Sequence, residues 1–217
     1  MREAFIESVE ALIEENRIAG LRANIGASWR ALSVWRASGE TVRPSAPEGF
    51  ESTLVGIVTC AEDFALEQSR DARSSLRQAY DLTRDAHYWE FATNAGGTIE
   101  SIFEIVTCLW QFCHDDCYFE EYDTSISKEA SLFVPHLIGL LGLDEAKAVI
   151  GSSVVAWILG PEDPIRSWRD GGGWRTWGDL LRADVASLLA AQNLTLGQVK
   201  IMALVGHRGA LAVLEEA

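Results

Sequence analysis

Residues 98–123 read TIESIFEIVTCLWQFCHDDCYFEEYD, and this stretch decides the fold that we expect. Its apolar side chains recur every three or four residues, which is the period of an α-helix with one face turned to a core. Thr98 follows a glycine-containing turn and is a residue type that caps helix N-termini. The pattern therefore predicts one long core helix that begins at Thr98 and around which the rest of the chain is organised.

The remainder of the chain also favours helices, because no segment alternates apolar and polar residues as a half-buried strand does. Helices are expected over 2–16, 18–37, 52–91 with a break, a segment from 127 that Pro135 interrupts, 144–159, and three short stretches within 176–216. The fold class is all-α, a single bundle of roughly eight to nine helices. Residues 1–160 would form the main helical domain. Residues 161–217 would be a C-terminal helical segment packed on it, either within the same domain or as a small three-helix subdomain.

The chain is acidic, with a formal net charge of −14 at pH 7 over 217 residues. An acidic surface repels phosphate groups, so we expect neither nucleic acid nor an anionic membrane surface as a partner. No apolar run is as long as a membrane-spanning helix, and the acids near the N-terminus do not fit a signal peptide. These features predict a cytoplasmic protein whose four cysteines are reduced thiols.

The acids of the central stretch lie opposite its apolar stripe or beyond its end. Such a cluster favours either a solvated surface or a surface that binds a basic protein. The second reading is the leading hypothesis: a non-enzymatic interaction protein of the inhibitor or immunity type, which needs no cofactor. Its binding residues would be Glu100, Glu104, Asp115, Asp116, Glu120, Glu121 and Asp123. The oligomeric state stays open.

The cysteines of the central stretch have two interpretations. Cys113 and Cys117 are four residues apart, so on a helix they share a face, and His114 lies beside Cys113. Both cysteines continue the apolar stripe, and a buried thiol packs as a small hydrophobic side chain. We therefore expect core cysteines, with a metal site or a redox pair as the alternatives.

The dipeptide His114-Asp115 supports a rival hypothesis, because it resembles the core of the HD-domain metal phosphohydrolases, which are all-helical. The pattern of that family is a histidine, a His-Asp pair and a distant aspartate. Here His87 precedes the pair, with Arg84 three residues before it, and Asp184 follows. The resemblance implies a metal-dependent phosphohydrolase with His87, His114, Asp115 and Asp184 as metal ligands.

Arginines recur at helical spacing shortly before the central stretch, at positions 70, 73, 77 and 84. This spacing places them on one face of the expected helix. Acids three or four residues away favour local ion pairs. The alternative is that the arginine stripe docks on an acidic surface, either of the central helix or of a partner.

One segment of the sequence has a near copy. Residues 57–64 (IVTCAEDF) and 105–112 (IVTCLWQF) are identical at five of eight positions. The match fits either a duplicated pair of helices or a chance likeness between two apolar helices.

Overall fold

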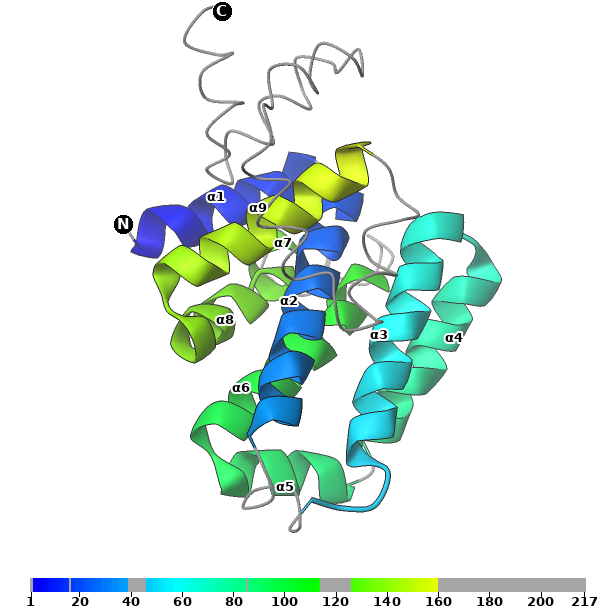
Figure 1. Ribbon diagram of the computed structural model, residues 1–217. Helices are drawn as coiled ribbons and strands as arrows, with labels where there is room; N and C mark the ends of the chain where they lie inside the picture. Colours follow the sequence, from blue (N-terminus) through cyan, green and yellow to red (C-terminus); the bar gives the residue numbers. More distant parts are fainter. Residues whose placement is uncertain (1, 16, 39–45, 85, 114–125, 160–217) are drawn as a thin grey trace, which may run out of the picture.

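The computed structural model describes residues 2–15, 17–38, 46–84, 86–113 and 126–159. Within these ranges the chain forms α-helices and short 3₁₀ helices and no strand, so the predicted all-α bundle is confirmed (Figure 1). The C-terminal segment 161–217 lies outside the described residues, and its relation to the rest of the chain stays a prediction.

The helices follow one another with short connections. Their bounds are α1 (Arg2–Glu15), α2 (Arg17–Ala37), α3 (Phe50–Glu67), α4 (Arg70–Asp81), η2 (Leu82–Arg84), α5 (Ala86–Ala95), α6 (Gly97–Thr107), η3 (Cys108–Cys113), α7 (Ile126–Ala130), α8 (Phe133–Leu141) and α9 (Leu143–Leu159), where η marks a 3₁₀ helix. The expected helices 2–16, 18–37 and 144–159 match α1, α2 and α9 within a residue or two. None of the described helices is long and apolar enough to cross a lipid bilayer.

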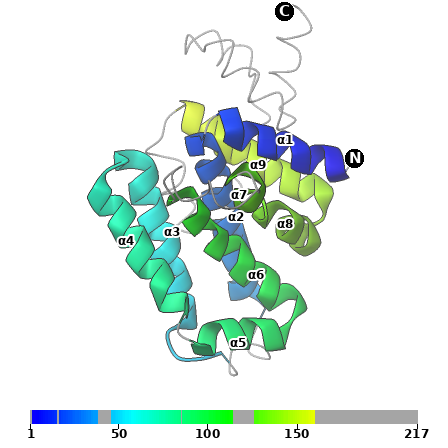
Figure 2. The same ribbon diagram turned by 180° about the vertical axis from the view of Figure 1, so that it is seen from behind.

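The centre of the bundle is α2 rather than the stretch that begins at Thr98. Every residue from Ala19 to Trp29 is buried, and α2 packs against α1, α3, α6, α8 and α9. Both views show it running through the middle of the molecule (Figures 1 and 2). Its alanines, glycines and serine leave room for neighbours on all sides, and a helix surrounded in this way lacks a strong amphipathic pattern.

The expected long helix from Thr98 is wrong at both ends that can be compared. Gly96, not Thr98, is the N-cap of α6. The α-helix then ends at Thr107, and residues 108–113 tighten into the 3₁₀ helix η3. The burial that the pattern predicted nevertheless holds, because Ile102, Val106 and Cys113 all lie in the core.

The change of helix type has a cause in α2. The buried Asn24 amide fits its neighbours when its nitrogen donates to the Ile105 carbonyl at 2.9 Å and its oxygen accepts from the Leu109 N–H at 3.2 Å. Those two backbone groups would bond to each other in a continuing α-helix. Asn24 therefore takes the place of one hydrogen bond of the helix, and the tighter 3₁₀ turn begins there.

The expected segment 52–91 is divided into three helices. Gln68 adopts a left-handed conformation with φ of 50° at the end of α3, and the Ser69 hydroxyl accepts from the Ala72 N–H at 3.1 Å to cap α4. A 3₁₀ turn then separates α4 from α5. Pro135 lies in the first turn of α8, where a proline breaks no helical hydrogen bond, so it sets the start of that helix.

Candidate functional site

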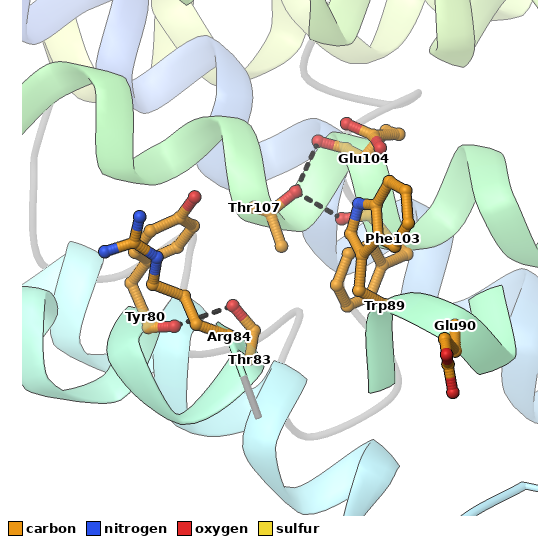
Figure 3. Close-up of a pocket in the computed structure, with 8 residues that line it drawn as sticks. All are labelled: Tyr80, Thr83, Arg84, Trp89, Glu90, Phe103, Glu104 and Thr107. Atoms are coloured by element: carbon orange, nitrogen blue, oxygen red, sulfur yellow. Dashed lines mark hydrogen bonds between the residues drawn. The ribbon is translucent and has the colours of Figure 1, made fainter. Parts of the chain in front are cut away.

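A pocket of about 490 Å³ opens between the end of α4 with η2, the helix α5 and the helix α6. This volume lies within the range of roughly 300–1,000 Å³ that is usual for ligand pockets. Figure 3 shows the side chains that line it, drawn from these separate segments of the chain. They are Tyr80, Thr83, Arg84, Trp89, Glu90, Phe103, Glu104 and Thr107.

Tyr80 and Arg84 form one side of the pocket (Figure 3). The Tyr80 ring stacks on Trp110 of η3, with centroids 5.1 Å apart and planes 8° apart. The Arg77 guanidinium lies over the other ring of this pair, 5.8 Å from the Trp110 centroid. Burial raises the pKa of the Tyr80 hydroxyl and the Arg84 guanidinium opposes that rise. Tyr80 is therefore held in place and remains a neutral hydroxyl.

Trp89, Phe103 and Glu104 form the opposite side (Figure 3). Phe103 is buried and stacks on Phe50 of α3, with centroids 6.1 Å apart. Trp89 is 56% exposed, which is unusual for so large an aromatic side chain. This side therefore combines a fixed apolar floor with an accessible indole ring.

Glu104 carries the main electrostatic feature of the pocket. The residue is only partly exposed, and burial raises the pKa of its carboxyl group. The charge of His136 on α8 lowers that pKa and the Glu100 carboxylate raises it further. Glu104 forms no ion pair with any residue that the structure describes. The carboxylate is thus partly removed from water without a cation bound to it, a state that costs free energy.

The two threonines of the pocket have their hydroxyl protons engaged. The Thr107 hydroxyl donates to the Phe103 carbonyl at 2.9 Å and lies 3.3 Å from the Glu104 carbonyl, and the Thr83 hydroxyl donates to the Tyr80 carbonyl at 2.6 Å. Both oxygens can still accept a hydrogen bond, so they would suit a ligand that donates protons.

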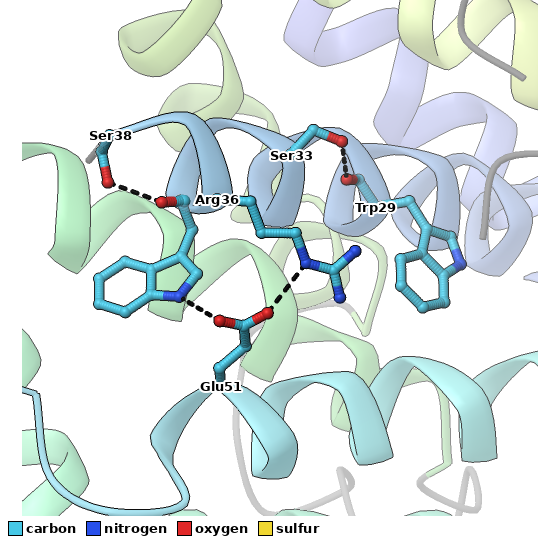
Figure 4. Close-up of polar contacts among 6 residues, drawn as sticks. Trp29, Ser33, Arg36, Ser38 and Glu51 are labelled. Carbon is cyan, nitrogen blue, oxygen red and sulfur yellow. Dashed lines mark hydrogen bonds and ion pairs between the residues drawn. The ribbon is translucent and has the colours of Figure 1, made fainter. Parts of the chain in front are cut away.

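The walls of the pocket are positioned by the contact between α2 and α3, which fixes the hairpin that leads into α4 (Figure 4). The Trp35 indole N–H donates to the Glu51 carboxylate at 3.0 Å, and the Arg36 Nε donates to the other oxygen at 2.9 Å. One helical face further along, the Trp29 indole N–H donates to Glu62 at 2.7 Å. Both tryptophans lie in the core, as the sequence predicted, and each also anchors a glutamate.

The predicted binding residues are only partly placed. Glu100 and Glu104 lie on α6, where both are half-buried rather than facing solvent as the helical phase predicted. The remaining five, Asp115, Asp116, Glu120, Glu121 and Asp123, lie outside the described residues. Of the acids predicted to bind a partner, Glu104 is the one that the structure brings into a pocket.

The predicted metal ligands are not brought together among the described residues. His87 lies on α5 with an exposed side chain, whereas His114, Asp115 and Asp184 fall outside the described ranges. Within those ranges no three histidine, cysteine, aspartate or glutamate side chains are grouped as a metal site requires. The phosphohydrolase hypothesis therefore stays a prediction.

The described cysteines behave as core residues. Cys108 and Cys113 are free and buried, and desolvation raises the pKa of each thiol to about 12. Cys60 is free and half-buried, and burial raises its pKa as well. Thiols of this kind are poor nucleophiles near neutral pH. Cys117 lies outside the described residues, so its predicted partnership with Cys113 stays a prediction.

Most of the pocket was not predicted from the sequence. Arg84 belonged to the arginine stripe and Glu104 to the acidic set, but Tyr80 and Trp89 were read only as members of helical segments. Trp89 carried a usable signal, because it stands among polar residues in the sequence HYWEF at 87–91. The arginine stripe itself turns partly to aromatic rings, with Arg73 over Phe64 and Arg77 over Trp110.

No protein-family model, curated protein or solved structure matches this chain. The fold and the pocket define it as an all-α protein with a half-buried carboxylate and an exposed tryptophan in one cavity.

Proposed function

We propose that this protein is a non-enzymatic interaction protein of the inhibitor or immunity type, and that it binds a basic protein partner in the cytoplasm. A cationic side chain of the partner would enter the pocket beside Glu104. The observation that carries the proposal is the half-buried Glu104 carboxylate, whose pKa burial raises and which has no ion pair with a described residue.

A cation at this position would relieve an existing cost. Its charge would favour the ionised carboxylate, and the charge-assisted hydrogen bond would replace contacts with water that burial has removed. The exposed face of Trp89 offers a second attraction, because a cation over an indole ring gains about 0.5–2 kcal/mol depending on its exposure. Together these groups favour a guanidinium or ammonium group over a neutral side chain.

The charge of the whole chain suits the same partner. At −14, the protein attracts basic proteins from a distance and orients them before contact. This long-range term raises the association rate and falls with ionic strength, whereas the contact at Glu104 acts mainly on the dissociation rate. The two contributions can therefore be separated in a kinetic experiment.

The direct test uses defined peptides in fluorescence polarisation. A labelled peptide with arginine at its probe position is compared with the same peptide carrying glutamine there. The proposal expects the arginine peptide to bind at least about tenfold more tightly, and Glu104→Gln to remove that preference. Glu7→Gln on α1 is the matched control, because it removes one exposed carboxylate far from the pocket. Equal binding of the two peptides by the unmodified protein would contradict the proposal.

A second test addresses the acids that lie outside the described residues. Immobilised protein with Asp116, Glu120, Glu121 and Asp123 neutralised is compared with the unmodified protein for capture of a purified basic protein such as a histone. Loss of capture that also responds to salt supports their predicted role. Capture that is unchanged by neutralisation removes these four acids from the binding surface.

A further inference from the structure

The pocket holds a positive charge as well as a negative one. Arg84 approaches from the end of α4 on the side of Tyr80, whereas Glu104 belongs to the opposite side with Trp89, and Thr107 lies between them (Figure 3). The Arg84 side chain is exposed and makes no ion pair with a described residue. Two opposite charges therefore share one cavity without neutralising each other.

This arrangement disfavours a ligand with a single charge. A cation bound to Glu104 alone would be repelled by the Arg84 guanidinium, and an anion bound to Arg84 alone would be repelled by the Glu104 carboxylate. A group that carries both charges satisfies both residues, with its apolar part against Trp89 and Phe103. Such complementarity gives specificity, because each missing charge leaves one side chain of the pocket unpaired.

We infer that the pocket receives the C-terminal basic residue of a partner protein, with its side-chain cation on Glu104 and its terminal carboxylate on Arg84. This inference rests on the proposed function and narrows it. A terminal residue supplies both charges from one position of the chain. It also enters as a chain end, which suits a cavity walled by α4 with η2, by α5 and by α6. An internal segment would have to enter and leave between the same helices.

The test compares four acetylated peptides on the full-length protein by isothermal titration. The first ends in Ala-Leu-Arg with a free carboxylate. The second is its C-terminal amide, the third ends in Ala-Leu-Gln with a free carboxylate, and the fourth is the amide of Ala-Leu-Arg-Asp. The inference expects the first peptide to bind at least about tenfold more tightly than each of the others. N-acetylarginine alone, which lacks the rest of the chain, should bind at least about tenfold more weakly than the first peptide.

Two substitutions assign the charges. Arg84→Gln should abolish the preference for the free carboxylate over the amide, and Glu104→Gln should abolish the preference for arginine over glutamine. Arg70→Gln, which removes an exposed guanidinium from the start of α4 without touching the pocket, should change neither preference. Circular dichroism melting of each variant checks that the fold is intact.

The outcomes separate the inference from the proposed function. If arginine is preferred over glutamine but the amide binds as well as the free acid, the terminal carboxylate has no role and the inference fails while the proposed function stands. Equal binding of the Ala-Leu-Arg-Asp amide would replace the chain terminus by an internal acid and overturn the inference. Equal binding of N-acetylarginine would make the cavity a site for a small molecule. No preference for arginine at all would remove both proposals.

Discussion

Replacing Asn24 by alanine tests the contact that ends α6. The Asn24 side chain is fully buried and bonds two backbone groups, the Ile105 carbonyl at 2.9 Å and the Leu109 N–H at 3.2 Å. In Asn24→Ala both groups lose their partner inside the core. They can remain unpaired, or they can approach each other and continue the α-helix at the expense of the packing of η3.

The expected cost follows from these two bonds. Each neutral hydrogen bond contributes about 1 kcal/mol net, and a buried group left unpaired costs about 1–3 kcal/mol. We therefore expect Asn24→Ala to lower the free energy of unfolding by about 2–4 kcal/mol. Asn24→Asp should cost more, because a carboxylate still accepts from Leu109 but faces the Ile105 carbonyl and buries a charge.

Urea unfolding followed by tryptophan fluorescence measures these differences by linear extrapolation. Ser28→Ala is the matched control on the same face of α2, because its hydroxyl reaches the Ile105 carbonyl only at 3.5 Å. That substitution should cost less than about 1 kcal/mol. If Asn24→Ala unfolds within about 0.5 kcal/mol of the unmodified protein, the Asn24 bonds do not hold the switch from α6 to η3.

Three further predictions concern packing and titration. A Cβ at Gly20 would lie 2.5 Å from Ile13 Cγ1, so Gly20→Ala should lower the melting temperature, whereas Gly56→Ala meets nothing within 4 Å and should gain about 1 kcal/mol of helix propensity. Iodoacetamide at pH 8 should label Cys108 only after denaturation, because a pKa of about 12 leaves almost no thiolate, and peptide mapping by mass spectrometry would detect early labelling. Because burial raises the pKa of Glu104, the folded protein binds its proton more tightly than the unfolded chain does, and this contribution to stability is lost as pH rises through the raised pKa. The difference in urea midpoint between Glu104→Gln and the unmodified protein should therefore grow in favour of the variant from pH 4 to pH 7, and a constant difference would contradict the shift.

Periodicity in the sequence predicted where helices lie but not which one is central. The bounds of α1 and α9 follow from apolar residues at helical spacing, which is a local property of the chain. The centrality of α2 depends on contacts with five other helices, and its small residues weaken the one-sided pattern by which a surface helix is recognised. The stretch at 98–123 was favoured because its apolar stripe is clear, and a clear stripe is typical of a helix with one exposed side.

The pocket was harder to predict for a related reason. Its two sides come from residues 80–90 and 103–107, and the stacking of Tyr80 on Trp110 and of Phe103 on Phe50 sets their orientation. Glu104 was identified by its charge, yet helical phase alone placed it toward solvent. The turn between α4 and α5 brings other side chains over it, and no local pattern in α6 records that.

The near copies at 57–64 and 105–112 show how far a local pattern reaches. The first lies wholly within α3, whereas the second changes from α6 to η3 after its third residue. The two share Ile-Val-Thr-Cys, so propensity at these positions assigns both to the same helix type. What separates them is the Asn24 amide, which bonds within the second copy. A buried asparagine costs free energy unless its amide is paired, so its place inside the apolar segment 17–37 is the sequence signal that some backbone nearby leaves its regular hydrogen-bond pattern.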